Sequence, residues 1–271
     1  MADWSTKHVL ITVRTYPSPA RKSAEASCTG GITAEGDWIR LFPVPYRLMD
    51  EERRFSKWQW IDVSVLKASG DTRPESFKLN IDSIKVQGKV GTDDGWRERR
   101  ALIEPLRRPS MCRIQRERDQ NSFPTLGFFR PHEIIRLKIE PAEQKEWTPE
   151  QLEILRQSHE GDLFQRTPAQ ILEKIPFEFR YEFRCGDADC RTHTMLCTDW
   201  EMLQSYRNWR KTYGDGWERP FRQRYEREMI DRFETHFFVG TIHRYPASWI
   251  IVGLFYPPRR QPRDLFEAPN D

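Results

Sequence analysis

Four potential metal ligands lie within thirteen residues of the second half of the chain. They are Cys185, Cys190, His193 and Cys197, with the spacing C-x4-C-x2-H-x3-C. Zinc prefers thiolate and imidazole ligands, and a structural zinc site uses four of them in a tetrahedron. The segment reads as a turn that leaves a strand, so these side chains could converge on one ion. The alternative is a set of ordinary reduced thiols beside a turn histidine, because the spacing lacks a C-x2-C pair.

Two carboxylates follow this segment directly, on Asp199 and Glu201. Such a pair could bind a divalent ion or act as general acid and base, which would give a metal-dependent nuclease or hydrolase using the Cys185–Glu201 region. On a helix, however, side chains two residues apart point roughly 200° away from each other. An Asp before a helix and a Glu in its first turn are typical of capping, which is the interpretation we favour over catalysis.

A second group of candidate residues combines basic and aromatic side chains in the first third of the chain. Cationic groups can hold phosphates while aromatic rings stack on unpaired bases. The group consists of Arg14, Arg40, Lys57, Trp58, Trp60 and Arg73. It predicts a surface for single-stranded or structured RNA or DNA. The alternative is that the tryptophans form a barrel core and that Arg73 makes a local ion pair within its loop.

The composition excludes several classes of protein. The chain has 271 residues with 44 basic and 41 acidic side chains, a net charge of only +3, so nucleic-acid contacts would have to come from local patches. No apolar run reaches the ~18–20 residues of a membrane span, and the first residues lack the pattern of a signal peptide. Five cysteines without an export signal predict a reducing, cytoplasmic location and no disulfide framework.

The elements that must position these residues are mostly short strands in the first third. Their Gly- and Pro-containing turns favour a small barrel. We expect strands over 8–16, 30–42 (a hairpin with its turn at 34–37), 58–66 and 81–90. A short helix is expected over 96–104.

The rest of the chain alternates strand and helix signals. Strands are expected over 111–117, 134–139 and 177–184 and in a hairpin spanning 237–255, with helices starting at 148, 198 and 219. We therefore predict a mainly β fold with α insertions, built from two OB-like small β-barrels. The first covers 1–108, and the second covers 109–258 with a helical insertion near 198–234. Residues 259–271 read as a loose tail.

Several stretches of this sequence resemble a bacterial family described as a dual OB-containing domain. In the first half these are Val9-Leu-Ile-Thr-Val-Arg-Thr-Tyr-Pro, Cys28-Thr-Gly-Gly-Ile-Thr, Trp38-Ile-Arg-Leu-Phe-Pro-Val-Pro, Lys57-Trp-Gln-Trp-Ile-Asp-Val and Asp71-Thr-Arg-Pro-Glu-Ser. In the second half they include Asp199-Trp-Glu, Phe238-Val-Gly-Thr and Trp249-Ile-Ile-Val-Gly-Leu-Phe-Tyr-Pro-Pro. The resemblance implies two OB-type barrels, assigns no activity and implies no zinc site.

Three functions remain open at this point. The first is a non-catalytic nucleic-acid-binding module, inferred by analogy from the barrel fold. The second is the metal-dependent nuclease or hydrolase. The third is an interaction or regulatory subunit that contacts a protein partner through exposed Trp and Arg side chains.

Overall fold

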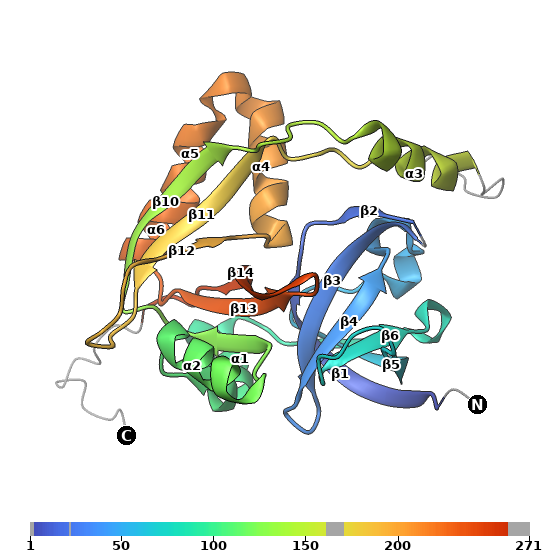
Figure 1. Cartoon of the computed structure of the whole chain (residues 1–271), viewed down its shortest axis with the longest axis horizontal. Helices are drawn as coiled ribbons and strands as arrows, with labels where there is room; N and C mark the ends of the chain where they lie inside the picture. The colour runs from blue at the N-terminus through green and yellow to red at the C-terminus, as the bar shows by residue number, and fades with distance from the viewer. Residues whose placement is uncertain (1–2, 22, 161–170, 260–271) are drawn as a thin grey trace, which may run out of the picture.

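The computed structural model describes residues 3–21, 23–160 and 171–259, which form a mainly β protein with helices between its strands (Figure 1). Apart from Arg259, the predicted loose tail over 259–271 lies outside these residues. Within the described ranges, no helix is both long and apolar enough to cross a membrane.

The first part of the chain closes into a five-stranded barrel, drawn in blue to cyan in Figure 1. Its strands are β1 (Ser5–Arg14), β3 (Ala24–Thr33), β4 (Trp38–Val44), β5 (Gln59–Lys67) and β6 (Ser76–Leu79). The order around the barrel is β1, β3, β4, β6, β5, and β5 pairs with β1 to close it. Neighbouring strands are antiparallel except β4 and β6, which are parallel. This closed arrangement is consistent with an OB-like barrel.

The barrel core follows from the alternating pattern of its strands. In β5 the alternate residues Ile61, Val63 and Val65 are fully buried, and they pack with apolar residues of β1 and β4. Gly31 allows β3 to approach β1 closely, because a Cβ at this position would lie 2.1 Å from the carbonyl oxygen of Leu10. The strands predicted over 8–16, 30–42 and 58–66 are therefore confirmed, with shifted ends.

The predictions for residues 76–90 need correction. The strand expected over 81–90 is a 3-10 turn (Ile81–Ser83) followed by the shorter β7 (Lys85–Lys89), which pairs with β5. The sequence analysis missed β6, whose four residues follow a loop rich in charged side chains. It also missed β2 (Ser18–Ala20), which pairs with one end of β3.

The second part of the chain contains two sheets. One has the order β10 (Glu133–Pro141), β11 (Phe177–Arg184), β12 (His193–Leu196). The other has the order β14 (Tyr245–Phe255), β13 (His236–Ile242), β9 (Leu126–Phe129), β8 (Arg107–Arg108). An isolated parallel bridge between Cys197 and Ile251 links them. Among the described residues, the strand pairing does not close this region into a second barrel.

A helix replaces the strand that we expected over 111–117. This is α2 (Met111–Asn121), which follows α1 (Asp93–Ile103) and a short 3-10 turn. Ser110 caps α2 because its hydroxyl accepts a hydrogen bond from the N–H of Arg113. Met111 and Ile114 are its buried residues, and their spacing of three suits a helix rather than a strand.

The other predicted helices are confirmed. At α3 (Pro149–Glu160), Thr148 and Gln151 form reciprocal capping hydrogen bonds. The helical insertion near 198–234 consists of α4 (Trp200–Tyr213), α5 (Glu218–Arg222), a π-helical turn (Gln223–Arg227) and α6 (Glu228–Asp231). In Figure 1 these helices, drawn in orange, lie along β10 and β11.

The two parts of the chain share a hydrophobic core. Buried residues of the barrel and of α1 pack against β9, β13 and β14, and Figure 1 shows β13 and β14 beside the barrel. The rings of Trp58 and Phe255 are 5.2 Å apart at their centroids, and those of Trp38 and Phe238 are 6.1 Å apart. The barrel and the second part are thus packed directly on each other.

Candidate metal centre

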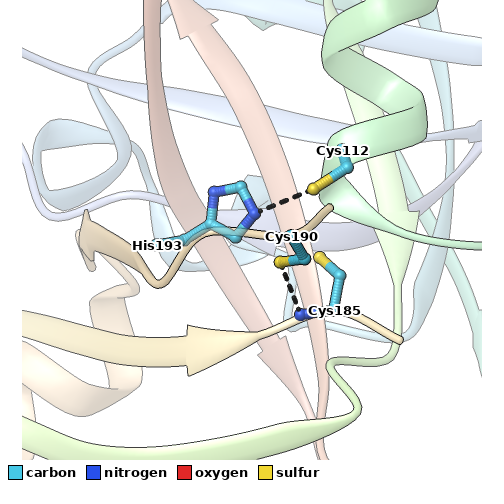
Figure 2. A group of neighbouring side chains, drawn as sticks. All are labelled: Cys112, Cys185, Cys190 and His193. Carbon is cyan, nitrogen blue, oxygen red and sulfur yellow. Dashed lines mark hydrogen bonds between the residues drawn. The ribbon is translucent and has the colours of Figure 1, made fainter. Parts of the chain in front are cut away.

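Three cysteines and one histidine converge at one end of β11 (Figure 2). Cys112 lies in the first turn of α2, Cys185 follows β11, Cys190 lies in the loop after it, and His193 begins β12. The four ligand atoms all lie within 4.8 Å of one another. This cluster could hold a metal ion.

Local contacts hold each ligand in place. The pairing of β11 with β12 sets Phe183 opposite His193, and the imidazole stacks on the Phe183 ring at 5.1 Å. His193 Nε2 lies 3.3 Å from the Sγ of Cys112, so the histidine faces the cluster. The backbone N–H of Cys185 donates to the Sγ of Cys190 at 3.1 Å.

An ion pair fixes α2 against the loop that carries two of the ligands. Arg116 of α2 contacts the carboxylate of Asp187 at 2.8 Å. The N–H of Cys190 donates to the carbonyl oxygen of Asp187, which tightens the turn between Cys185 and Cys190. The Asp187 side chain therefore holds the loop against α2 through its ion pair with Arg116.

Burial shifts the pKa of three of the four ligands. It raises the pKa of the Cys112 thiol to about 12, with neighbouring Cys190 and Cys185 adding to the effect. Burial also raises the pKa of Cys185 and lowers the pKa of His193. At neutral pH Cys112, Cys185 and His193 are therefore uncharged, with the imidazole in the form that binds metals. A bound cation would displace the thiol protons, as metal binding to cysteine requires.

Three of the four predicted ligands belong to the cluster, and the prediction of Cys197 is wrong. Cys197 lies beyond β12, fully buried, where its N–H donates to the carbonyl oxygen of Phe179. The sequence analysis missed Cys112 because it assigned that segment to a strand. The available signal was the cysteine count: only Cys28 and Cys112 lay outside the motif, and Ser110 marks a helix start beside Cys112.

The two carboxylates after the motif have structural partners. Asp199 is the N-cap of α4 and accepts hydrogen bonds from the N–H groups of Met202 and Leu254. Lys57 donates to Asp199 at 3.1 Å and to Glu201 at 3.0 Å. The capping interpretation of Asp199 is confirmed.

Lys57 is buried at the junction between the barrel and the second part. Burial lowers the pKa of its ammonium group, but the carboxylates of Asp199 and Glu201 outweigh that effect and raise it above its usual range. The ammonium also donates to the carbonyl oxygen of Leu254. Lys57 therefore joins the two parts of the chain and is not presented to a ligand.

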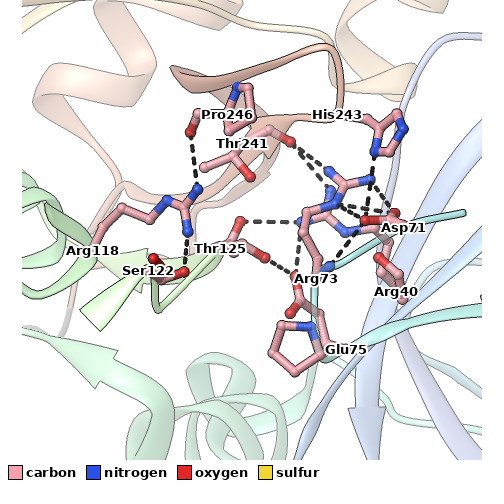
Figure 3. A network of polar contacts seen from close by, with 12 residues as sticks. Arg40, Asp71, Arg73, Glu75, Arg118, Ser122, Thr125, Thr241, His243 and Pro246 are labelled. Carbon is pink, nitrogen blue, oxygen red and sulfur yellow. Dashed lines mark hydrogen bonds and ion pairs between the residues drawn. The ribbon is translucent and has the colours of Figure 1, made fainter. Parts of the chain in front are cut away.

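The other basic residues predicted to bind nucleic acid also turn inward. The Arg14 guanidinium lies over the rings of Tyr46, at 3.5 Å, and Trp200, at 4.4 Å. Arg40 is buried and pairs with Glu75 at 3.0 Å, while Arg73 pairs with Asp71 (Figure 3).

Arg40 and Arg73 form part of a network that crosses to the second part of the chain. Both guanidiniums donate to the carbonyl oxygen of Thr241 in β13, at 3.5 Å and 2.8 Å. His243 of the β13–β14 turn lies 3.5 Å from a carboxylate oxygen of Asp71 (Figure 3). The local ion pair expected for Arg73 exists, although its partner is Asp71 and not the nearby Glu.

The two tryptophans of the predicted surface lie in different environments. Trp58 is buried, although in the core shared by the two parts and not in the barrel interior that the alternative expected. Trp60 is half-buried and stacks on His8, with ring centroids 4.5 Å apart. The six predicted nucleic-acid residues thus do not form one exposed face, because most of them hold the molecule together.

Two family models match the chain. One, described as Domain of unknown function (DUF8758), matches residues 5–105. The other, described as Domain of unknown function (DUF8757), matches residues 107–270. No curated protein matches the chain. Because residues 107–270 are more than half of its length, the chain belongs to the DUF8757 family.

Proposed function

We propose that Cys112, Cys185, Cys190 and His193 bind one Zn²⁺ ion. The observation that carries this proposal is the convergence of three sulfur atoms and one imidazole nitrogen within 4.8 Å. Around tetrahedral zinc, with bonds of about 2.0–2.3 Å, neighbouring ligand atoms are about 3.5–3.8 Å apart. The cluster needs only a small contraction to reach these distances, and its ligand set is one that structural zinc sites use.

The role of this ion is structural. Four protein ligands fill the tetrahedron and leave no position for a water molecule or substrate. The ligands come from α2 and from the loop between β11 and β12, which are far apart in the sequence. The ion therefore fixes these segments against each other, and the proposal favours a non-catalytic protein over a metal-dependent hydrolase.

Metal analysis of the purified protein tests this proposal. We expect about one zinc per chain in the wild-type protein and in Cys28→Ser, whose cysteine lies in the barrel outside the cluster. We expect Cys112→Ser to lose the zinc. Equal metal content in Cys112→Ser and Cys28→Ser, or no zinc in the wild-type protein, would reject the site.

We also propose that both parts of the chain are OB-like. In the second part, β10, β11 and β12 follow one another as β1, β3 and β4 do in the barrel. The parallel bridge from Cys197 to Ile251 places β14 beside the end of β12, as β6 lies parallel to β4. The helices α4 to α6 lie between the third and fourth strands of this series.

A second proposed function is binding of single-stranded nucleic acid by the barrel. The observation that favours it is a set of three lysines on β6 and β7: Lys78, Lys85 and Lys89. All three are exposed; Lys85 lies opposite Asp62 in the pairing of β7 with β5, and a hydrogen bond with His8, followed by the charge of Lys85, lowers the pKa of that carboxyl group. Ammonium groups of this kind can follow a phosphate backbone.

Titration with labelled single-stranded oligonucleotides at low and high salt tests this second function. We expect binding at ~50 mM salt that weakens steeply at ~200 mM, and a smaller salt dependence in Lys85→Gln. Absence of binding at the lower salt concentration would reject it. Lys211→Gln, on an exposed part of α4 distant from β7 in the chain, is the matched control.

A further inference from the structure

A cavity of about 410 Å³ lies where the barrel meets the chain segment before β9. Aromatic side chains from three separate segments line it: Trp38 of β4, Phe77 of β6 and Phe123 of the loop after α2. The first two rings are half-buried, and Phe123 is 48% exposed. Rings supplied by both parts of the chain thus surround a space large enough for a small planar group.

One wall of this cavity carries a buried carboxylate, that of Glu75. Its side chain is only 8% exposed. Oε1 accepts hydrogen bonds from Arg40 Nη2, at 3.0 Å, and from the hydroxyl of Thr125 (Figure 3). The hydrogen bonds of the Glu75 side chain with described residues all go to Oε1, and Oε2 is not among the buried atoms that lack a partner, so it is accessible. A carboxylate oxygen held in place by its neighbours is therefore left to accept a bond from a ligand.

A cation lies at the same cavity. Lys7 of β1 lines it and is half-buried, and its charge adds to a hydrogen bond with Thr33 in lowering the pKa of the exposed Glu35. An ammonium group beside aromatic walls can hold a phosphate while the rings stack on the attached base. The cavity thus combines stacking surfaces with one cation, Lys7, and two carboxylates, the buried Glu75 and the exposed Asp37.

We propose that this cavity binds a nucleobase with N–H donors on its edge, and guanine in particular. The proposal rests on the second function above and names its ligand. The aromatic side chains would stack on the base, and Glu75 Oε2 would accept a hydrogen bond from the ring N–H or the amino group. Guanine places these two donors side by side, whereas adenine and cytosine place an acceptor next to their amino group, which a carboxylate repels.

The test is fluorescence anisotropy with a labelled oligo-uridine that carries one central guanosine. Phe123→Ala and Trp38→Ala are compared with Tyr245→Ala, which removes an aromatic ring that is 65% exposed outside the cavity. We expect roughly tenfold weaker binding for the first two variants, because one stacked base contributes about 1–3 kcal/mol. Tyr245→Ala should bind as the wild-type protein does.

A second readout addresses the carboxylate. In the wild-type protein, replacing the central guanosine by adenosine should weaken binding several-fold, and in Glu75→Gln this preference should disappear. Guanosine monophosphate alone serves as a further probe: tighter binding of the oligonucleotide assigns the cavity to strands, and equal binding assigns it to free nucleotides. Either result supports a nucleobase site, provided that Phe123→Ala weakens the binding of the probe.

Two outcomes would overturn this inference separately from the second function. If the wild-type protein binds the oligonucleotide but Phe123→Ala and Tyr245→Ala bind it equally well, the cavity is not the site while nucleic-acid binding stands. If guanosine and adenosine oligonucleotides bind alike, the role of Glu75 is rejected. If the wild-type protein binds no oligonucleotide and no guanosine monophosphate, both proposals fail together.

Discussion

Each of the two parts of this chain is held together internally in a different way. The first closes through backbone hydrogen bonds, because β5 pairs with β1 over six residues and completes the barrel. The second consists of two sheets that are linked through the backbone by the bridge between Cys197 and Ile251. Where the backbone closes the structure, side chains need only fill it; where it does not, side chains must join the pieces.

The candidate metal centre lies between the two sheets of the second part, where side chains must connect them. The helix α2 lies between β8 and β9 in the chain, and both belong to the four-stranded sheet. The other three ligands belong to the loop and strand ends of the three-stranded sheet. A zinc ion bound to all four residues would therefore connect the two sheets of the second part. The barrel contains one cysteine, Cys28, which is outside the cluster.

Removal of the metal should have the largest effect and should act on the second part. A structural zinc site contributes an apparent ~10–16 kcal/mol in zinc-finger peptides, as much as the whole stability of a typical domain. We expect a strong chelator to increase amide hydrogen exchange in α2, β11 and β12. Exchange in β1 and β5 should change little. Peptide-resolved mass spectrometry measures both regions in one experiment.

The Cys112→Ser variant is the control for effects of the chelator itself. Its exchange pattern without chelator should match that of the chelated wild-type protein, and chelator should add nothing further. If exchange rises equally in the barrel and in the second part, the ion does not act on the second part alone, and the comparison drawn above is wrong.

Breaking the junction between the two parts should have the next largest effect, and it should involve both. Replacing Lys57 by Met leaves the carboxylate of Asp199 buried without its cation. Loss of one partner from a buried ion pair costs about 3–5 kcal/mol. We expect a fall of this size in the free energy of unfolding, measured by urea denaturation, with faster exchange in β5 and in α4.

Two further variants make this result specific. Lys78→Met removes an exposed lysine of the barrel and should change stability by less than about 0.5 kcal/mol. In Lys57→Met with Asp199→Asn, the buried negative charge is gone, so part of the lost stability should return. A double variant that is as unstable as the sum of the two single variants would show that Lys57 and Asp199 do not interact.

The difference between local and distant contacts explains what could be predicted from the sequence. The alternation in β11, the capping box at Thr148 and the N-cap at Asp199 are encoded within a few residues, and each was predicted. Contacts between distant residues leave no local pattern. Nothing near Lys57 indicates that it meets Asp199, and nothing near Arg14 indicates that Trp200 covers it.

The candidate metal centre shows both situations at one site. Cys185, Cys190 and His193 are close in the sequence, between the end of β11 and the start of β12, so their spacing alone brought them together in the prediction. Cys112 lies 81 residues from His193 and reaches the cluster only because α2 packs there. Cys197 continued the motif in the sequence, but it lies at the far end of β12 from His193 and is buried in the core. Proximity in the chain was therefore a good guide for three ligands and a poor guide for the fourth.

A pH change should produce a smaller effect, and it should act at the core that the two parts share. His236 of β13 stacks on Phe128 at 5.1 Å and donates from Nδ1 to the carbonyl oxygen of Glu234 at 2.7 Å. Burial lowers the pKa of His236 to about 4, and nearby Arg130 and Arg107 act in the same direction. Unfolded histidine has a pKa of about 6.5.

Between these two pKa values the unfolded chain takes up a proton that the folded protein resists. The contribution of His236 to stability is therefore complete above pH ~6.5 and falls as the pH drops toward 4, by at most about 3 kcal/mol. Urea denaturation at pH 7, 5.5 and 4.5 should show a steeper loss in the wild-type protein than in His236→Gln. His132→Gln, which changes an exposed histidine outside the shared core, should follow the wild-type curve. Parallel curves for wild type and His236→Gln would mean that the shared core tolerates a charge at β13, and that the two parts are packed less tightly than their rings indicate.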